Sequence, residues 1–178
     1  EVPRGLLATK AGAELIPEGL SGDTWRTPTY YGTTISCFGI CYNRDRMRAQ
    51  GLARPPERWD DLADPAWFGS LGLADPTKSG SIAKAFETIV QVECRKAVEA
   101  AGFGAAAEEY EAKIAAAKLP AGQMPEGVPA EYQRAVEAGW VNGLRLIQLI
   151  GANARYFTDS ASKVPLDVGI GNAAAGLC

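Results

Sequence analysis

Residues 75–82 constrain the fold most, because a strand, a turn and a helix have to follow one another around them. The apolar run before them, residues 71–74, is typical of a buried strand. Pro76 has no amide hydrogen to donate to a neighbouring strand, so the strand is expected to end at Asp75. A long helical pattern begins near Ile82. The stretch therefore predicts a strand that passes through a short turn into a helix.

The turn itself, formed by Ser79, Gly80 and Ser81, permits two interpretations. Either serine can cap the helix with its hydroxyl, which makes the turn an ordinary helix start. Alternatively, Gly80 lets the backbone approach a bound group, and the free amides and dipole of the helix N-terminus attract an anion. The local pattern leaves both interpretations open.

The rest of the chain alternates between extended and helical patterns. The predicted elements are strands at 37–42, 71–74 and 167–171, and helices at 43–50, 82–101, 105–118, from Pro129 onward and from Asn172 onward. This alternation predicts an α/β domain whose mostly parallel sheet is flanked by helices. Ligands bind such sheets outside the carboxyl ends of the strands, where the junctions 75–81 and 169–172 are expected to lie.

Large apolar side chains indicate where these elements pack. Apolar residues at helical spacing predict a buried stripe along the helix that starts at Pro129, made of Tyr132, Val136, Trp140, Leu144 and Ile147 and widened by Leu146, Leu149 and Ile150. Trp59, Trp67 and Phe68 are expected to hold the loop 52–69 against the domain. The helix at 105–118 has little apolar surface and is expected on the outside.

The composition excludes several classes of function. The chain has no histidine, which removes Ser-His-Asp and Cys-His catalysis and the commonest transition-metal ligand. A net charge of -3 without a basic stripe indicates that nucleic acid is not a partner. No apolar run approaches the roughly 20 residues of a membrane helix. No signal peptide is present at Glu1, although the mature form of an exported protein starts in the same way.

The spacing of Cys37 and Cys41 suggests a metal or redox pair, but both lie in an extended stretch. Four residues of a strand span about 13 Å, which is too far for a disulfide or a shared zinc ion. We therefore expect both residues, and Cys94 in its helix, to be small core residues. The fourth cysteine, Cys178, carries no prediction.

Several motifs occur in an order and spacing that resemble a known family. They are residues 39–43 (GICYN), 56–62 (PERWDDL), 64–69 (DPAWFG), 75–80 (DPTKSG), 158–165 (TDSASKVP) and 168–176 (VGIGNAAAG). Together they resemble the extracellular solute-binding proteins of ABC importers, in the branch that includes ferric-iron-binding proteins. This resemblance implies a periplasmic-binding-protein type II fold, in which two α/β lobes are joined by hinge strands and the ligand binds in the cleft.

The resemblance implies that this chain corresponds mainly to one lobe. Residues 1–28 would be the end of the preceding lobe or a connecting segment, and residues 29–178 the ligand-binding lobe, similar to a C-terminal lobe that stops short of its end. Gly39, Tyr42 and Asn43 would lie at the hinge between the lobes.

The resemblance also implies a ligand and its contacts. Cleft residues would be Ser79, Gly80, Ser81, Thr158, Ser160 and Asn172. The ligand would be a small anionic solute or ferric iron, with no cofactor, no catalytic residue and no metal-ligating residue in this chain. The full-length protein would be a periplasmic monomer that delivers its ligand to the membrane permease of the importer.

Ferric-binding members use an adjacent tyrosine pair that the resemblance places just beyond residues 168–176. Tyr30 and Tyr31 lie before the crossing strand, so we interpret them as packing or hinge residues. Two other functions remain open: a ligand-sensing lobe of a receptor, and an enzyme of similar architecture. An enzyme needs an acid–base group, and Asp75 and Asp159 are the only carboxylates near the proposed cleft.

Overall fold

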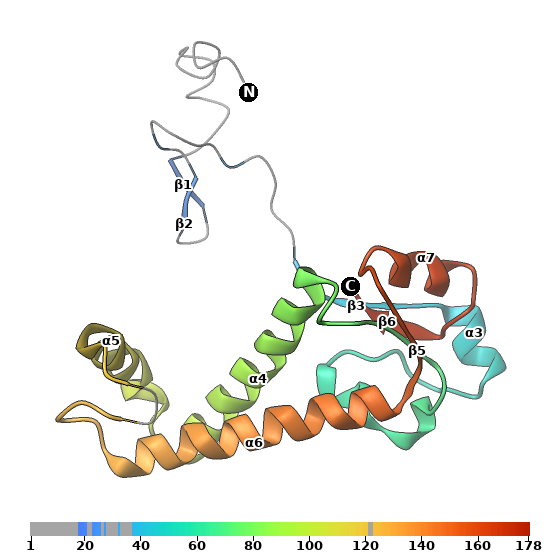
Figure 1. Ribbon diagram of the computed structural model, residues 1–178. Coiled ribbons are helices and arrows are strands. Elements are labelled where there is room, and N and C mark those ends of the chain that lie inside the picture. The colour runs from blue at the N-terminus through green and yellow to red at the C-terminus, as the bar shows by residue number, and fades with distance from the viewer. Residues whose placement is uncertain (1–17, 21–22, 26, 28–31, 33–36, 121–122) are drawn as a thin grey trace. The chain divides into compact units, whose positions relative to one another are not determined.

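The structure, a computed structural model, describes residues 18–20, 23–25, 27, 32, 37–120 and 123–178. The chain separates into two compact units, Glu1–Cys37 and Phe38–Cys178. In the first unit, β1 (Gly19–Leu20) and β2 (Asp23–Thr24) pair as a small antiparallel hairpin (Figure 1). Tyr30 and Tyr31 lie outside the described residues.

The second unit contains all the other described helices and strands. In chain order these are β3 (Ile40–Tyr42), α3 (Arg44–Ala49), the 3-10 helices η1 (Trp59–Ala63) and η2 (Pro65–Trp67), β4 (Leu71–Ala74), α4 (Gly80–Ala100), the 3-10 helix η3 (Gly104–Ala106), α5 (Ala107–Ala117), α6 (Ala130–Ala152), β5 (Ala154–Thr158), α7 (Lys163–Gly169) and β6 (Ala175–Leu177).

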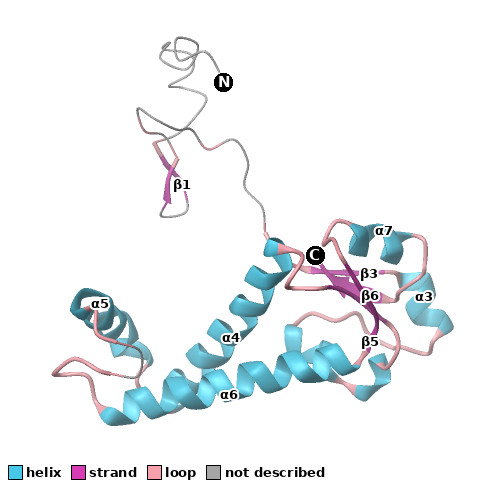
Figure 2. Cartoon of the chain, in the orientation of Figure 1, coloured by secondary structure: helices cyan, strands magenta, loops and turns pink. Residues whose placement is uncertain are grey.

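The strands of the second unit form one mixed sheet in the order β3-β6-β4-β5. Both pairs that involve β4 are parallel, while β3 runs antiparallel to β6. Figure 2 shows α7 over one side of this sheet and α6 along the other. The predicted α/β class with a mostly parallel sheet flanked by helices is therefore confirmed.

The core explains why β4 was recognisable from sequence. Its residues are buried along its whole length, as expected for a central strand covered on both faces. The strand ends before Asp75, and Ser79 is the N-cap residue of α4, so the predicted passage from strand to helix is confirmed. The helix begins at Gly80, slightly earlier than the apolar pattern suggested.

Helices α4 and α6 pack through glycine, and the predicted stripe on α6 is wrong in part. Tyr132 and Ile150 are buried, but Trp140 and Leu144 are 53% and 52% exposed, and Leu149 is also exposed. The helix instead turns small residues toward α4. A Cβ atom on Gly139 would lie 2.3 Å from the Cα atom of Cys94. The backbones approach too closely for larger side chains, so the contact face is defined by glycine.

Beyond this contact, α4, α5 and α6 form a separate apolar cluster. The rings of Phe103, Tyr110 and Tyr132 meet edge to face, with centroids 5.0 to 6.3 Å apart. No residue of α5 is buried, which agrees with its predicted place on the outside. We call residues 90–120 and 123–143 the helical arm.

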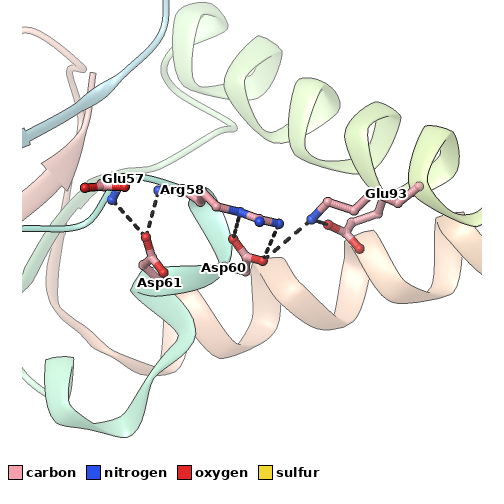
Figure 3. Close-up of polar contacts among 6 residues, drawn as sticks. Glu57, Arg58, Asp60, Asp61 and Glu93 are labelled. Atoms are coloured by element: carbon pink, nitrogen blue, oxygen red, sulfur yellow. Dashed lines mark hydrogen bonds and ion pairs between the residues drawn. The ribbon is translucent and has the colours of Figure 1, made fainter.

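The loop that carries η1 and η2 is held by polar and apolar contacts. Trp67 is buried and Trp59 packs against the core, as predicted, but Phe68 is 77% exposed. Phe68 follows the short η2 helix and points away from the core, so it does not hold the loop. Arg58 donates to both oxygens of the Asp60 carboxylate (Figure 3). The same carboxylate pairs with Lys96 of α4 at 3.6 Å.

Near the end of the chain, two predicted elements are exchanged. Residues 167–171, predicted as a strand, belong largely to helix α7 and the turn after it. Residues 175–177, predicted as part of a helix, form strand β6. Gly171 adopts a φ of 81°, which ends α7 and redirects the chain into the sheet. Strand β5, which was not predicted, fills the segment before α7.

The four cysteines are free thiols, and one prediction about them is wrong. Cys37 is exposed, because it precedes β3 instead of lying inside the strand. Cys41 and Cys94 are partly buried. Burial and the neighbouring Cys178 raise the pKa of the Cys41 thiol to about 12, so it stays protonated and unreactive at neutral pH.

Candidate functional site

Two strand ends meet at one edge of the sheet. Because β4 and β5 are parallel neighbours, the segments that follow them emerge on the same side. The Asp75 amide donates to the Thr158 carbonyl at 2.7 Å, which ties the two segments together. We call residues 75–81 and 158–163 the carboxyl edge. This is the position at which open α/β sheets bind ligands.

The first segment of the carboxyl edge is a turn organised by Asp75. Its carboxylate accepts hydrogen bonds from the amide and the hydroxyl of Thr77, at 2.9 and 2.7 Å. These bonds, with help from Lys78, lower the pKa of Asp75. Its carbonyl accepts the amides of Lys78 and Ser79, both at 3.0 Å. Asp75 therefore builds the turn and remains ionised.

The turn leaves the start of α4 open. The hydroxyl of Ser79 makes no capping bond, and Ser81 lies inside the helix, so the hydroxyl-capped helix start is wrong in this respect. The first intrahelical bond runs from the Ala83 amide to the Ser79 carbonyl at 3.1 Å. Within the described residues, the amides of Gly80, Ser81 and Ile82 have no acceptor. Nothing lies within 4 Å of a Cβ atom placed on Gly80, so a ligand can approach them.

An open pocket of about 380 Å³ lies at the same edge. It is lined by Asp75, Lys78, Tyr156, Phe157, Thr158, Asp159 and Lys163. Both segments of the carboxyl edge contribute to it, and two lysines and two aspartates face the same space. The pocket is therefore polar and bears charges of both signs.

Behind the pocket, Asp167 of α7 is buried, and both oxygens of its carboxylate accept hydrogen bonds. It accepts hydrogen bonds from Lys163 and from the Tyr156 hydroxyl, the latter at 2.9 Å, with the Asn172 amide at 3.5 Å. These donors, Lys163 foremost, lower the pKa of Asp167. Burial and the Asp167 carboxylate raise the pKa of Tyr156 to about 12, so its hydroxyl keeps its proton.

The predicted ligand residues fall at two opposite ends of the strands. Ser79, Gly80 and Ser81 lie on the first segment of the carboxyl edge, and Thr158 and Ser160 lie on the second. Thr158 is buried and donates its hydroxyl to the Ser160 carbonyl at 2.7 Å, while Ser160 is exposed.

Asn172 does not lie on the carboxyl edge, and the strand-to-helix junction predicted at residues 169–172 is wrong. Asn172 precedes β6, and β6 runs parallel to β4 with Ala175 opposite Leu71, which places Asn172 at the amino ends of these strands. Its carbonyl accepts a hydrogen bond from Arg155 at 2.7 Å. The error follows from reading the segment before β6 as a strand leading into a helix.

The predicted hinge residues lie in or next to β3, which pairs with β6 in antiparallel orientation. Gly39 and Cys178 exchange two backbone hydrogen bonds of 2.8 and 3.2 Å. Asn43 caps α3 through its side chain and donates to the Val168 carbonyl at 2.8 Å. Tyr42 lies opposite Ala175 in the ladder.

Sequence reasoning missed four residues at or behind the pocket: Lys78, Tyr156, Lys163 and Asp167. The spacing of Lys163 and Asp167 is a helical ion-pair signal. The strand predicted at residues 167–171 conceals this signal, because Asp167 then lies outside any helix. Tyr156 lay in a segment with no assigned element.

Two negative findings apply to the described residues alone. Among them, no group of three or more Cys, Asp or Glu side chains is arranged to hold a metal ion. No helix in that part of the chain is long and apolar enough to cross a membrane.

Comparison with known proteins finds relatives that are much longer than the part this chain matches. An uncharacterized protein of Haemophilus influenzae Rd is 32% identical over 69 residues, which cover 38% of this chain and 20% of that protein. The solved periplasmic binding protein P5PA is similar at a TM-score of 0.49 and 16% identity, over 79% of this chain and 30% of that one.

A second similar structure is the periplasmic binding protein AfuA from Actinobacillus pleuropneumoniae with fructose-6-phosphate bound. Its TM-score is 0.47 and its identity 18%, again over 79% of this chain and 30% of that one. The chain thus spans well under half the length of the relatives it matches. A family model for the bacterial extracellular solute-binding proteins matches residues 3–130. That match covers most of the sequence, and the chain therefore belongs to the family of bacterial extracellular solute-binding proteins.

Proposed function

We propose that the chain is part of the substrate-binding component of an ABC importer and captures a small anionic solute, or ferric iron together with an anion, at the carboxyl edge. Its membership of the solute-binding family supports this role. The full-length protein would be a monomer outside the cytoplasmic membrane, and its partner would be the permease of the importer. No catalysis is involved.

One observation carries the proposal: the amides of Gly80, Ser81 and Ile82 have no acceptor among the described residues, and they begin α4 at the edge of the sheet that also carries the polar pocket. Free amides and the positive end of the dipole of α4 favour a negative charge there. The dipole alone contributes about 0.3–1 kcal/mol at an exposed site, and each charge-assisted hydrogen bond about 1.5–3 kcal/mol.

Binding would then be completed by a second lobe. The antiparallel pair β3 and β6 brings Gly39 and Cys178 side by side, as expected for two strands that cross between lobes. Closure around the ligand would add contacts from the opposite side and exclude water. The isolated 178 residues should accordingly bind more weakly than the full-length protein.

An enzymatic role has less support at this edge. The pKa of Asp75 is lowered by its bonds to Thr77, so this carboxylate is a poor proton donor at neutral pH. The chain has no histidine that could assist Asp75 or Asp159 in proton transfer.

The proposal is tested by the affinity of full-length variants for inorganic phosphate and for ferric citrate, measured by calorimetry. Gly80→Val should weaken binding by about ten-fold or more, because a branched side chain blocks access to the amides. Ser79→Ala should have a smaller effect, since it leaves every amide in place.

Gly169→Val is the matched control, because a Cβ atom there also has nothing within 4 Å. Thermal melts establish that all three variants fold. If Gly80→Val is folded and binds both probes like the wild type, the turn is only a helix start and the proposal is wrong.

A further inference from the structure

One wall of the pocket is built from hydrogen-bonded side chains that the proposed anion site at residues 80–82 does not use. Asp167 is 5% exposed and accepts hydrogen bonds from Lys163 of its own helix and Tyr156 of β5. Lys163 is 52% exposed at its side chain and lies 5.8 Å above the Tyr156 ring. In this cluster Asp167 is buried, while Lys163 and Tyr156 line the pocket.

Both lysines of this wall are already paired with aspartates. Lys163 pairs with Asp167, and Lys78 pairs with Asp75 at 3.9 Å. Asp159 has no ion pair among the described residues. The pocket thus offers no surplus of positive charge, and its side chains are poorly suited to a bare anion.

The same wall presents both hydrogen-bond donors and hydrogen-bond acceptors. The Lys163 ammonium has three N–H donors and uses one on Asp167. The Tyr156 hydroxyl gives its hydrogen to Asp167, which leaves its oxygen as an acceptor. The Asp159 carboxylate supplies further acceptors. A hydroxyl group both donates and accepts, so adjacent ligand hydroxyls match this arrangement better than an apolar or purely anionic group does.

We propose that Lys163 and Tyr156 contact the ligand and select hydroxyl groups, so that the site takes a hydroxylated anion whose charged end lies on the amides of residues 80–82. This inference rests on the proposed function. Asp167 is a positioning residue, because it holds both side chains without facing the pocket itself. Its effect is on selectivity for hydroxylated ligands.

The test compares two matched pairs of probes that differ in their hydroxyl groups: gluconate with hexanoate, and glycerol 3-phosphate with propyl phosphate. Calorimetry on the full-length wild type should show at least one hydroxylated member binding about ten-fold tighter than its partner. Lys163→Met should remove most of that preference. Asp167→Asn should reduce it, while the affinity for inorganic phosphate stays within about two-fold.

Lys113→Met is the control, because Lys113 also forms an i,i+4 ion pair, with Glu109, and lies 5.7 Å above the Tyr110 ring, but in the helical arm. It should leave the preference unchanged. A merely structural role of Asp167 would lower the affinity for every probe together and leave their ratio intact.

Equal affinity within both pairs, or a preference that survives Lys163→Met, overturns this inference. Binding of inorganic phosphate without binding of any hydroxylated probe also overturns it, but leaves the proposed anion site standing. If inorganic phosphate binds and Gly80→Val does not weaken it, the anion site fails, whatever the hydroxyl preference.

Discussion

The carboxyl edge and the helical arm are each stabilised by a different kind of interaction: polar contacts at the edge and close apolar packing in the arm. At the edge, two lysines and two aspartates line an open pocket, and hydrogen bonds to the buried Asp167 hold Lys163 and Tyr156 in place. In the arm, glycines bring α4 and α6 into backbone contact, and three aromatic rings pack edge to face. Changes in the arm should therefore alter stability without altering ligand selectivity, whereas polar changes at the edge should alter ligand selectivity.

The largest effect is expected from the core that supports the edge. Leu73 of β4 is completely buried, so Leu73→Ala leaves a cavity and should destabilise the protein by about 2–5 kcal/mol. Urea unfolding measures this loss. A loss below about 1 kcal/mol would show that the sheet tolerates the cavity and does not rigidly support the edge.

A smaller loss is expected in the arm from Gly139→Ala. Its Cβ atom would meet the Cα atom of Cys94 at 2.3 Å, so the helices must separate, at a cost of about 1–3 kcal/mol. Gly80→Ala is the control for the change in helix propensity, because its added Cβ atom would have no other atom within 4 Å. Phosphate affinity should be unchanged in Gly139→Ala. A loss of binding at unchanged stability would contradict the separation of the two regions.

The difference between these regions also explains what could be predicted. Strand β4, the turn and α4 carry local signals, namely a short apolar run, Pro76 and small residues at the helix start. The contact between α4 and α6 carries no such signal, because hydrophobic periodicity gives no weight to Gly139 and Gly143. The pattern therefore assigned Trp140 to the interior, although it is exposed.

The exchange of α7 and β6 has a related cause. The run from Val168 to Gly171 is short and apolar, and such runs fit either a strand or a buried turn of helix. Val164 and Val168 are buried one helical turn apart, and Ala173, Ala174 and Ala175 are buried against neighbouring elements. Tertiary contacts decide these assignments, so the i,i+4 spacing of Lys163 and Asp167 alone does not predict the cluster around Asp167.

A pH-dependent effect is expected from Asp167→Asn. Because the folded pKa of Asp167 is lowered, its carboxylate stabilises the protein above the ordinary value of 3.8. That stabilisation is lost as the pH falls through the lower folded value. Thermal melts of wild type and variant should therefore differ most at neutral pH and converge toward acid. A difference independent of pH would show that the ion pair with Lys163 contributes no net stability.

The smallest effect is expected from Trp140→Ser on the outer face of the arm. Trp140 is 53% exposed, so the change should alter stability by less than about 0.5 kcal/mol if the face is open to water. A loss of several kcal/mol in the full-length protein would show that another part of that protein covers this face.

The most direct test of the anion site is a titration of the isotope-labelled full-length protein with inorganic phosphate, followed by amide chemical shifts. The amides of Gly80, Ser81 and Ile82 have no acceptor among the described residues, so they should move downfield together and saturate with one affinity. Amides of the arm, such as those of Tyr110 and Gly139, should stay in place. Saturable shifts elsewhere, with these three amides unmoved, would contradict the assignment of the site to the carboxyl edge.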